Sequence, residues 1–174
     1  MTTRPSLLST AEARHFLLDA ARPVHDTEHV PTLDALGRVL ATDQLSLLNV
    51  PPMDNTQMDG YAVRAAECAS GSTVLRVSQR IPAGHVGLPL EAGTAARIFT
   101  GALIPDGADA VVMQEQCSFD AATSAVTVNH SPRAGEWVRR AGEDIREGST
   151  ILAAGTRLRA QELGLAASVG LATL

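Results

Sequence analysis

The chain is 174 residues long, has a formal net charge of −5 and contains 14 arginines but no lysine. Its length suits one or two small domains, and its acidic balance argues against a nucleic-acid-binding surface. Because Schiff-base chemistry and P-loop phosphate binding both require lysine, they are excluded, and an anion would have to be bound by arginine, by backbone N–H groups or by carboxylates through a metal.

The first predicted element is a helix that begins after Ser9. Ser9 can cap this helix, and Glu12 lies three residues later, as a capping box requires. Pro23 ends the helix, and four apolar residues at helical spacing predict a buried face: Ala13, Phe16, Leu17 and Ala20. A second, shorter helix is predicted over residues 33–40, although Gly37 weakens its helical propensity.

From about residue 51 the pattern changes to short apolar runs separated by proline and glycine, which predicts a module of small, irregular strands. The runs are Val74–Val77, Ala95–Ile98, Ala110–Met113 and Ala125–Val128. A short strand is then predicted at Ile151–Leu152, followed by a helix over residues 160–169 that Gly170 stops. We expect three residues of this helix to face the core: Leu163, Ala166 and Ala167.

Helical segments therefore lie at both ends of the chain, with strands between them. This order favours an α+β fold and an elongated chain of two modules. We expect an α/β outer module built from residues 1–50 and 142–174. A β-rich module of residues 51–141 is inserted between these two parts.

The segment PPMDNTQMDGYAV, residues 51–63, is the most informative part of the chain. It predicts a rigid polar loop that leads into a strand, and loops of this kind often hold ligands. Asp59 stands beside Gly60, which allows a sharp turn and leaves the carboxylate accessible. The carboxylate would then help to hold a divalent cation. The alternative from the residues alone is an Asx-turn within the loop.

Two later polar turns have a similar composition. Thr100 follows the run Ala95–Ile98 and precedes Gly101, where its hydroxyl could bind a phosphate oxygen or its own loop. In the third turn, Glu143 and Asp144 are adjacent, so on an extended chain one faces a site and the other faces solvent. Two arginines precede them and could neutralise a pyrophosphate, or form a solvated surface pair: Arg139 and Arg140. Glu115 fits either an oxygen ligand or an exposed acid at the end of a strand.

These three segments resemble the amino-terminal half of the molybdopterin molybdenumtransferases, which are the bacterial MoeA proteins and their relatives, including the carboxy-terminal part of gephyrin. The matching segments, in order, are PPMDNTQMDGYAV, RIFTGALIPDGADAVVMQE and GEDIREGSTILAAGTRL. The resemblance extends from the helix near Ser9 to the last residue. It implies that the sequence is an amino-terminal fragment, without the pterin-binding domain and the C-terminal β-barrel domain of the family.

The resemblance also implies a function. Family members insert molybdenum from molybdate into adenylylated molybdopterin and release AMP in a Mg²⁺-dependent step of molybdenum cofactor biosynthesis. They act as homodimers in which the second subunit completes the site, and we expect the fragment alone to be inactive. The alternative is a non-catalytic dimerisation or scaffold module of the same architecture. The residues do not distinguish Mg²⁺ from Mn²⁺, or molybdenum from tungsten.

The family's motifs transfer roles to particular residues. The aspartate of MDGY, the threonine of TGA and the aspartate of GED correspond to Asp59, Thr100 and Asp144, which we expect to be catalytic and to converge in space. Asp59 and Asp144 are the expected metal ligands. Four neighbouring residues are expected to contact the substrate: Gly60, Gly101, Arg139 and Arg140.

A cytoplasmic location is expected from three features of the sequence. No run of 18 or more apolar residues is present, so a membrane span is not predicted. The first residues lack the apolar core and cleavage site of a secretory signal. Cys68 and Cys117 are isolated and form neither a CxxC zinc motif nor a disulfide framework, which fits two unused thiols in a reducing compartment.

Overall fold

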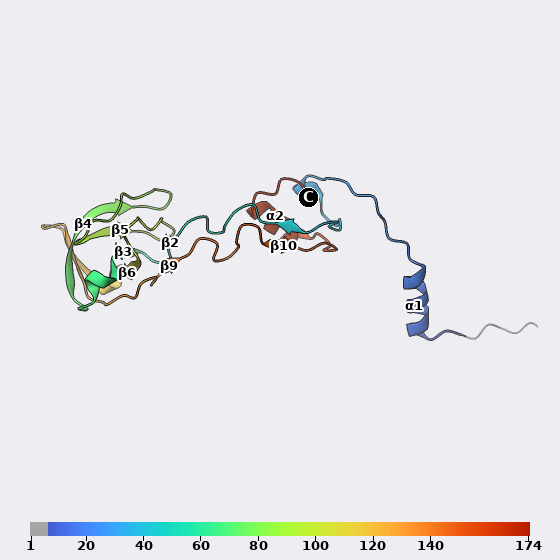
Figure 1. Ribbon diagram of the computed structural model, residues 1–174, viewed down its shortest axis with the longest axis horizontal. Helices are drawn as coiled ribbons and strands as arrows, with labels where there is room; N and C mark the ends of the chain where they lie inside the picture. Colours follow the sequence, from blue (N-terminus) through green and yellow to red (C-terminus); the bar gives the residue numbers. More distant parts are fainter. Residues whose placement is uncertain (1–6) are drawn as a thin grey trace, which may run out of the picture.

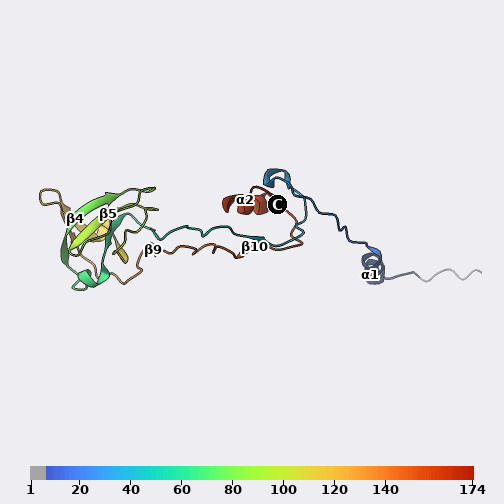
Figure 2. The same ribbon diagram turned by 45° about the horizontal axis from the view of Figure 1, so that its top comes forward.

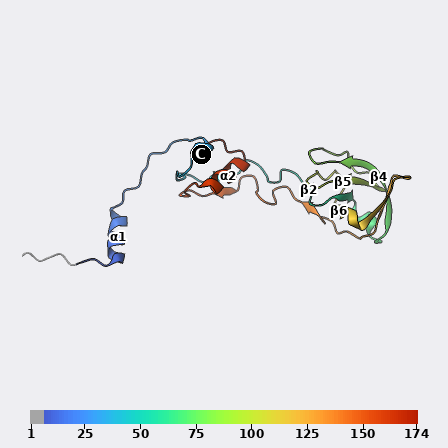
Figure 3. The same cartoon turned by 180° about the vertical axis from the view of Figure 1, so that it is seen from behind.

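The computed structural model describes residues 7–174 and shows an elongated α+β molecule (Figure 1). A β-rich part lies at one end, a smaller part with α2 and β10 lies in the middle, and α1 lies at the other end (Figures 2 and 3). The strands are β1 Gln44–Leu45, β2 Asn55–Thr56, β3 Gly60–Val63, β4 Thr73–Ile81, β5 Thr94–Ile98, β6 Ala110–Met113, β7 Cys117–Asp120, β8 Ala125–Val128, β9 Val138–Arg139 and β10 Thr150–Leu152. The helices are α1 Thr10–Ala20 and α2 Ala160–Ser168, with 3-10 turns η1 Thr32–Asp34, η2 Ala65–Cys68 and η3 Gln114–Gln116.

The β-rich part is built on one six-stranded sheet in the order β6-β3-β5-β4-β8-β7. Its neighbours are antiparallel except β4 and β5, which are parallel, and β4 carries a bulge between Val77 and Gln79. All four apolar runs identified in the sequence form strands of this sheet, as predicted. The strand expected after the polar loop is β3, which lies between β5 and β6.

Both faces of the sheet centre are buried, because residues that alternate along β3, β5 and β6 enter different hydrophobic clusters. Tyr61 and Val63 belong to one cluster, whereas Ala62 belongs to the other. The same alternation separates Ala95 from Ala96 on the neighbouring strand. A strand covered on both faces reads as a continuous apolar run, which explains why these segments were recognisable.

A third cluster joins the two ends of the chain. It contains Ala35 and Leu40 from the first part, and Leu152, Leu158 and Ala166 from the last part. Two segments connect this cluster to the sheet by running antiparallel: β1 pairs with β10, Val50 forms a bridge to Ile145, and β2 pairs with β9. The module boundaries at 50/51 and 141/142 remain a prediction, and residues 1–6 of the outer module lie outside the described part.

The predicted helix over residues 33–40 is wrong. Only the short turn η1 forms, and Gly37 then adopts a φ of +83°, outside the helical region. The backbone pairs instead with a distant segment: Leu40 N–H donates to the Thr156 carbonyl at 3.0 Å, and Leu158 N–H donates to the Arg38 carbonyl at 2.8 Å. Tertiary pairing therefore overrides a weak helical pattern.

The two long helices form where the sequence predicts them, but their buried faces differ from the prediction. Helix α1 has the full Ser9–Glu12 capping box, yet none of its residues is buried, and Phe16 is 66% exposed. In α2, Ala166 is buried as expected, whereas Ala167 is exposed and Glu162 is buried instead. Neither helix within residues 7–174 has the length and apolarity that a membrane-spanning helix requires.

Gly60 has no space for a side chain, so a substitution at this position tests the close approach of β3 to β6. A Cβ atom at Gly60 would lie 2.0 Å from the Val112 carbonyl oxygen, which belongs to the neighbouring backbone and cannot rotate away. We therefore expect Gly60→Ala to destabilise the sheet by about 3 kcal/mol or more, the upper part of the range for overpacked cores. Chemical unfolding followed through amide signals of β3 measures this change.

The matched control is Gly164→Ala in helix α2, where an added Cβ meets no atom within 4 Å. Alanine has a higher helix propensity than glycine, so this variant should stabilise α2 by about 0.5–1 kcal/mol. If both substitutions proved neutral, the close approach of β3 to β6 would be incorrect.

Candidate functional site

Asp59 and Thr100 form a direct pair at the end of the sheet. Gly60 of β3 is the register partner of Ile98 of β5, so the residue before β3 meets the residues that follow β5. The backbone N–H and the hydroxyl of Thr100 both donate to Oδ1 of Asp59, each at 2.8 Å. The predicted meeting of these two residues is therefore observed.

The pair holds Asp59 in its ionised form. The backbone N–H of Thr100, then its hydroxyl, lowers the pKa of the Asp59 carboxyl, and the charge of Arg97 contributes in the same direction. Oδ2 of Asp59 accepts no hydrogen bond from residues 7–174. The pair thus presents one oriented carboxylate oxygen at the molecular surface.

The two glycines beside the pair have structural reasons for their identity. Gly60 is required because the Val112 carbonyl leaves no space for a Cβ. Gly101 has a φ of +79°, which favours glycine, and its N–H donates to the Thr56 carbonyl at 2.9 Å. Their predicted contact with a substrate remains a prediction.

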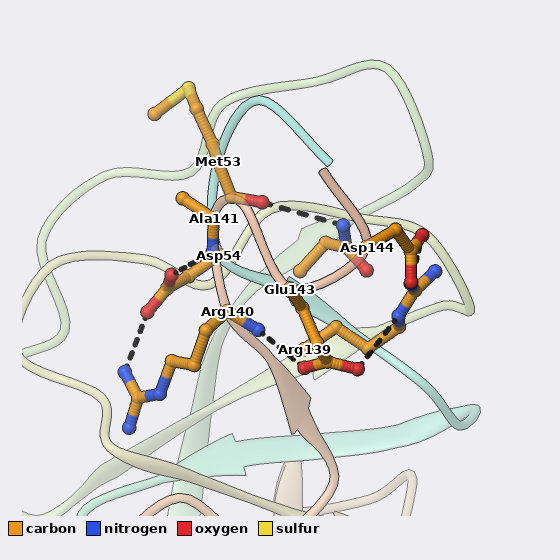
Figure 4. A network of polar contacts seen from close by, with 8 residues as sticks. Met53, Asp54, Arg139, Arg140, Ala141, Glu143 and Asp144 are labelled. Atoms are coloured by element: carbon orange, nitrogen blue, oxygen red, sulfur yellow. Dashed lines mark hydrogen bonds and ion pairs between the residues drawn. The ribbon is translucent and has the colours of Figure 1, made fainter. Parts of the chain in front are cut away.

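A second polar network surrounds Asp54 and the turn after β9 (Figure 4). Oδ1 of Asp54 accepts a hydrogen bond from the Ala141 N–H at 2.8 Å, and Oδ2 forms an ion pair with Nη1 of Arg140 at 2.6 Å. The Ala141 N–H is the main reason that the pKa of Asp54 is lowered, and the Arg140 guanidinium adds to the effect against a partial desolvation cost. Asp54 therefore fastens the turn to the loop before β2, a role that the sequence did not indicate.

Asp144 belongs to this second network and has no hydrogen bond or ion pair to Asp59 or Thr100. Its Oδ2 lies 2.5 Å from Nη2 of Arg139, and Glu143 Oε1 lies 3.4 Å from Nε of the same arginine. The expectation that Glu143 and Asp144 face opposite ways is therefore wrong, because this segment is a turn and not an extended chain. Ion pairing, with Asp144 as the first cause, raises the pKa of Arg139.

Asp144 also lines a shallow hollow of about 420 Å³ between the turn and helix α2. Leu165 of α2 and Ile151 of β10 form part of its wall. The hollow gives Asp144 access to a ligand. Glu115 has no comparable setting, since it is exposed and accepts a hydrogen bond from Gln114 at 3.1 Å.

The carboxylates of this region fit a cation that is bound jointly by the protein and a substrate better than one that the protein encloses alone. Within residues 7–174 no group of three or more His, Cys, Asp or Glu side chains is placed to hold a metal ion. Mg²⁺, however, commonly takes only one or two carboxylates and fills its remaining positions with water and substrate phosphates. Oδ2 of Asp59 fits that demand, and so does Oδ1 of Asp144, which accepts no hydrogen bond in the described part of the chain although Oδ2 is paired with Arg139.

Arg97 was missed by the sequence analysis. It lies near the end of β5, where its Nη1 donates to the Gly60 carbonyl at 3.0 Å and its Nη2 donates to Oε1 of Gln114 at 2.5 Å. A charged residue within an otherwise buried strand is the signal that could have identified it, because such groups are retained only with partners.

A family model, curated relatives and a solved structure all match this chain to the same protein family. The family described as "MoeA N-terminal region (domain I and II)" matches residues 8–170. The molybdopterin molybdenumtransferase of Haemophilus influenzae is 34% identical over 166 residues, which covers 95% of this chain and 41% of that protein. Molybdopterin molybdenumtransferase 2 of Mycobacterium tuberculosis is 42% identical over 164 residues, with coverages of 91% and 39%.

A solved structure, that of a molybdopterin biosynthesis moeA protein from Pyrococcus horikoshii OT3, matches with a TM-score of 0.88 and 34% identity. It covers 97% of this chain, and the chain covers 45% of that protein. The chain therefore spans about two fifths of the length of the curated relatives it matches.

The contribution of Thr100 to the ionisation of Asp59 can be measured by titration. Thr100→Val removes the hydroxyl but keeps the backbone N–H, so the pKa of Asp59 should rise yet stay below its ordinary value. Thr100→Ser should leave it unchanged. Carbon-13 NMR of the Asp59 carboxyl across the acidic range provides the measurement.

The sign of the pH effect follows from this depressed pKa. The stabilisation from the pair is fully present above the unfolded pKa of about 3.9 and is lost as the pH falls through the folded value. An Asp59 pKa at or above the ordinary value in the unmodified protein would contradict the pairing.

The fastening role of Asp54 can be tested through the amide of Ala141. Asp54→Ala removes its acceptor, and amide exchange at Ala141 should become about tenfold faster, since a hydrogen bond to a charged group contributes ~1.5–3 kcal/mol. Asp54→Asn keeps an acceptor oxygen and should show a smaller change. An unchanged exchange rate at Ala141 in the Asp54→Ala variant would mean that the bond to Asp54 does not hold the turn.

Proposed function

The chain belongs to the family of MoeA N-terminal regions, and we propose that it acts as the amino-terminal part of a transferase that inserts molybdenum from molybdate into adenylylated molybdopterin and releases AMP. The support is its relatives, which are named as molybdopterin molybdenumtransferases, together with the geometry of the Asp59–Thr100 pair. A cytoplasmic homodimer is part of the same proposal and rests on the resemblance alone.

The single observation that carries the proposal is the oriented carboxylate of Asp59. Cleavage of a phosphoanhydride depends chiefly on neutralising charge on the phosphate oxygens. A Mg²⁺ ion bound at Oδ2 of Asp59 would supply this neutralisation and activate a bound oxygen ligand. Thr100 serves this site by orienting the Asp59 carboxylate through two hydrogen bonds to Oδ1, which leaves Oδ2 available to a cation.

Asp144 is proposed as the second acidic residue of the site. In the chain as it stands, its charge is balanced by Arg139. A substrate phosphate could draw Arg139 away from Asp144 and leave both carboxylate oxygens free to bind a cation, because arginine binds phosphate and carboxylate through the same fork of N–H groups. Asp144 and Arg139 would then both contact the substrate, as the family's motifs imply.

The proposal is tested in a chimera, because the chain spans only part of its relatives. Residues 1–174 replace the matching 41% of the Haemophilus influenzae enzyme, and the chimera is expressed in cells that lack their own transferase. We expect it to restore molybdenum cofactor formation, measured as the activity of a molybdenum-dependent enzyme. The Asp59→Asn chimera should lose at least about 100-fold of this activity, since a neutral amide binds a cation poorly.

Asp106→Asn is the matched control, because Asp106 is also an exposed turn carboxylate but lies in no proposed site. It should retain full activity, and all three chimeras should melt at the same temperature, since exposed substitutions usually change stability by less than about 0.5 kcal/mol. Normal activity of the Asp59→Asn chimera would refute the proposed role of Asp59. A chimera that dimerises but forms no cofactor would favour the non-catalytic module.

A further inference from the structure

A second hollow, of about 430 Å³, lies on the six-stranded sheet and is distinct from the hollow at Asp144. We name it the arginine–aromatic pocket, after five of its lining residues: Tyr61, Arg80, Arg97, Phe99 and Phe119. Three of the five aromatic residues of the chain are gathered here. Its volume falls within the range of small-molecule sites, about 300–1,000 Å³.

The two arginines of this pocket are held side by side. Arg80 of β4 and Arg97 of β5 are register partners in the parallel strand pair, so two positive charges stand directly opposite each other. Both guanidinium groups lie 4.6 Å from the centre of the Phe99 ring. Like charges on facing positions of a sheet destabilise it, and the ring offsets only part of this repulsion.

Direct ionic partners do not relieve this repulsion, although the charge of Asp59 interacts with Arg97 at longer range. Within residues 7–174 neither Arg80 nor Arg97 forms an ion pair, although the chain carries 19 acidic residues. The side chain of Arg80 also makes no hydrogen bond in the described part of the chain. By contrast Arg76, four residues earlier on the same strand, lies 3.7 Å from Glu91. A pair of like charges without a direct ionic partner, fixed by strand register, is a position that a small anion would stabilise.

The rest of the pocket is suited to a flat ring. Phe119 of β7 is 53% exposed and so is accessible to a ligand, and Tyr61 adds a second aromatic wall. Aromatic rings stack on one another and on guanidinium planes. A polyanion is not favoured, because the net charge of −5 would repel its further phosphates.

We propose that the arginine–aromatic pocket binds a small phosphate monoester that carries a planar ring, with a mononucleotide as the simplest example. Arg80 and Arg97 bind the phosphate, and Phe119 contacts the ring. Arg97 also connects the pocket to the Asp59–Thr100 pair, because it holds the Gly60 carbonyl at 3.0 Å. The inference needs only binding, so it can hold if the transferase proposal fails and can fail if that proposal holds.

The test is calorimetric titration of the 174-residue chain with AMP, adenosine and inorganic phosphate. We expect AMP to bind with a Kd below about 1 mM, and adenosine and phosphate to bind at least about tenfold more weakly, because each supplies only half of the contacts. NMR shifts induced by AMP should centre on Arg80, Phe99 and Phe119.

Arg80→Gln removes one charge from the pocket without loss of a hydrogen bond or ion pair, and it should weaken AMP binding by about tenfold or more. Arg76→Gln is the matched control on the same strand and should change the Kd by less than about twofold. Absence of AMP binding at about 10 mM, equal effects of the two substitutions, or phosphate binding as tight as that of AMP would each overturn the proposal.

Discussion

The position of strand β2 determines how both polar networks are placed. This two-residue strand is paired on one side with β9 and on the other side with the turn that follows β5. Thr56 donates to the Ala102 carbonyl at 3.0 Å and accepts from the Gly101 N–H at 2.9 Å. Because one short backbone segment joins three parts of the chain, Asp54 before it and Asp59 after it are each aligned with a distant partner.

The backbone pairing also explains how Asp59 and Thr100 can be positioned accurately although they are not packed in a hydrophobic core. Asp59 directly precedes β3, whose four residues are all buried, so a strand packed on both faces positions its backbone. Thr100 follows β5, which is also buried at four of five positions. Two exposed polar groups are therefore held at 2.8 Å by strands that bury their neighbours, which is the preorganisation that a cation or phosphate site requires.

The sequence predicted the strands of the sheet better than the contacts between charges. Short apolar runs bounded by glycine and proline identified the central strands, because strands buried on both faces need apolar residues at every position. The helix over residues 33–40 failed because Gly37 and a distant backbone partner favoured extended pairing. Likewise, the exposure of Phe16 in α1 depends on what covers the helix, which local periodicity does not contain.

The candidate residues were recognisable as motifs, but their partners were not. Arg139 and Arg140 seemed available to bind a phosphate, yet the fold pairs them with Asp144, Glu143 and Asp54. Register places Arg80 and Arg97 opposite each other with no ion pair to either, a relation that the sequence of one strand alone does not contain. Charge that a ligand can use is thus set by strand register and turn geometry, and in this chain Arg80 and Arg97 on the sheet lack the ion pairs that Arg139 and Arg140 form.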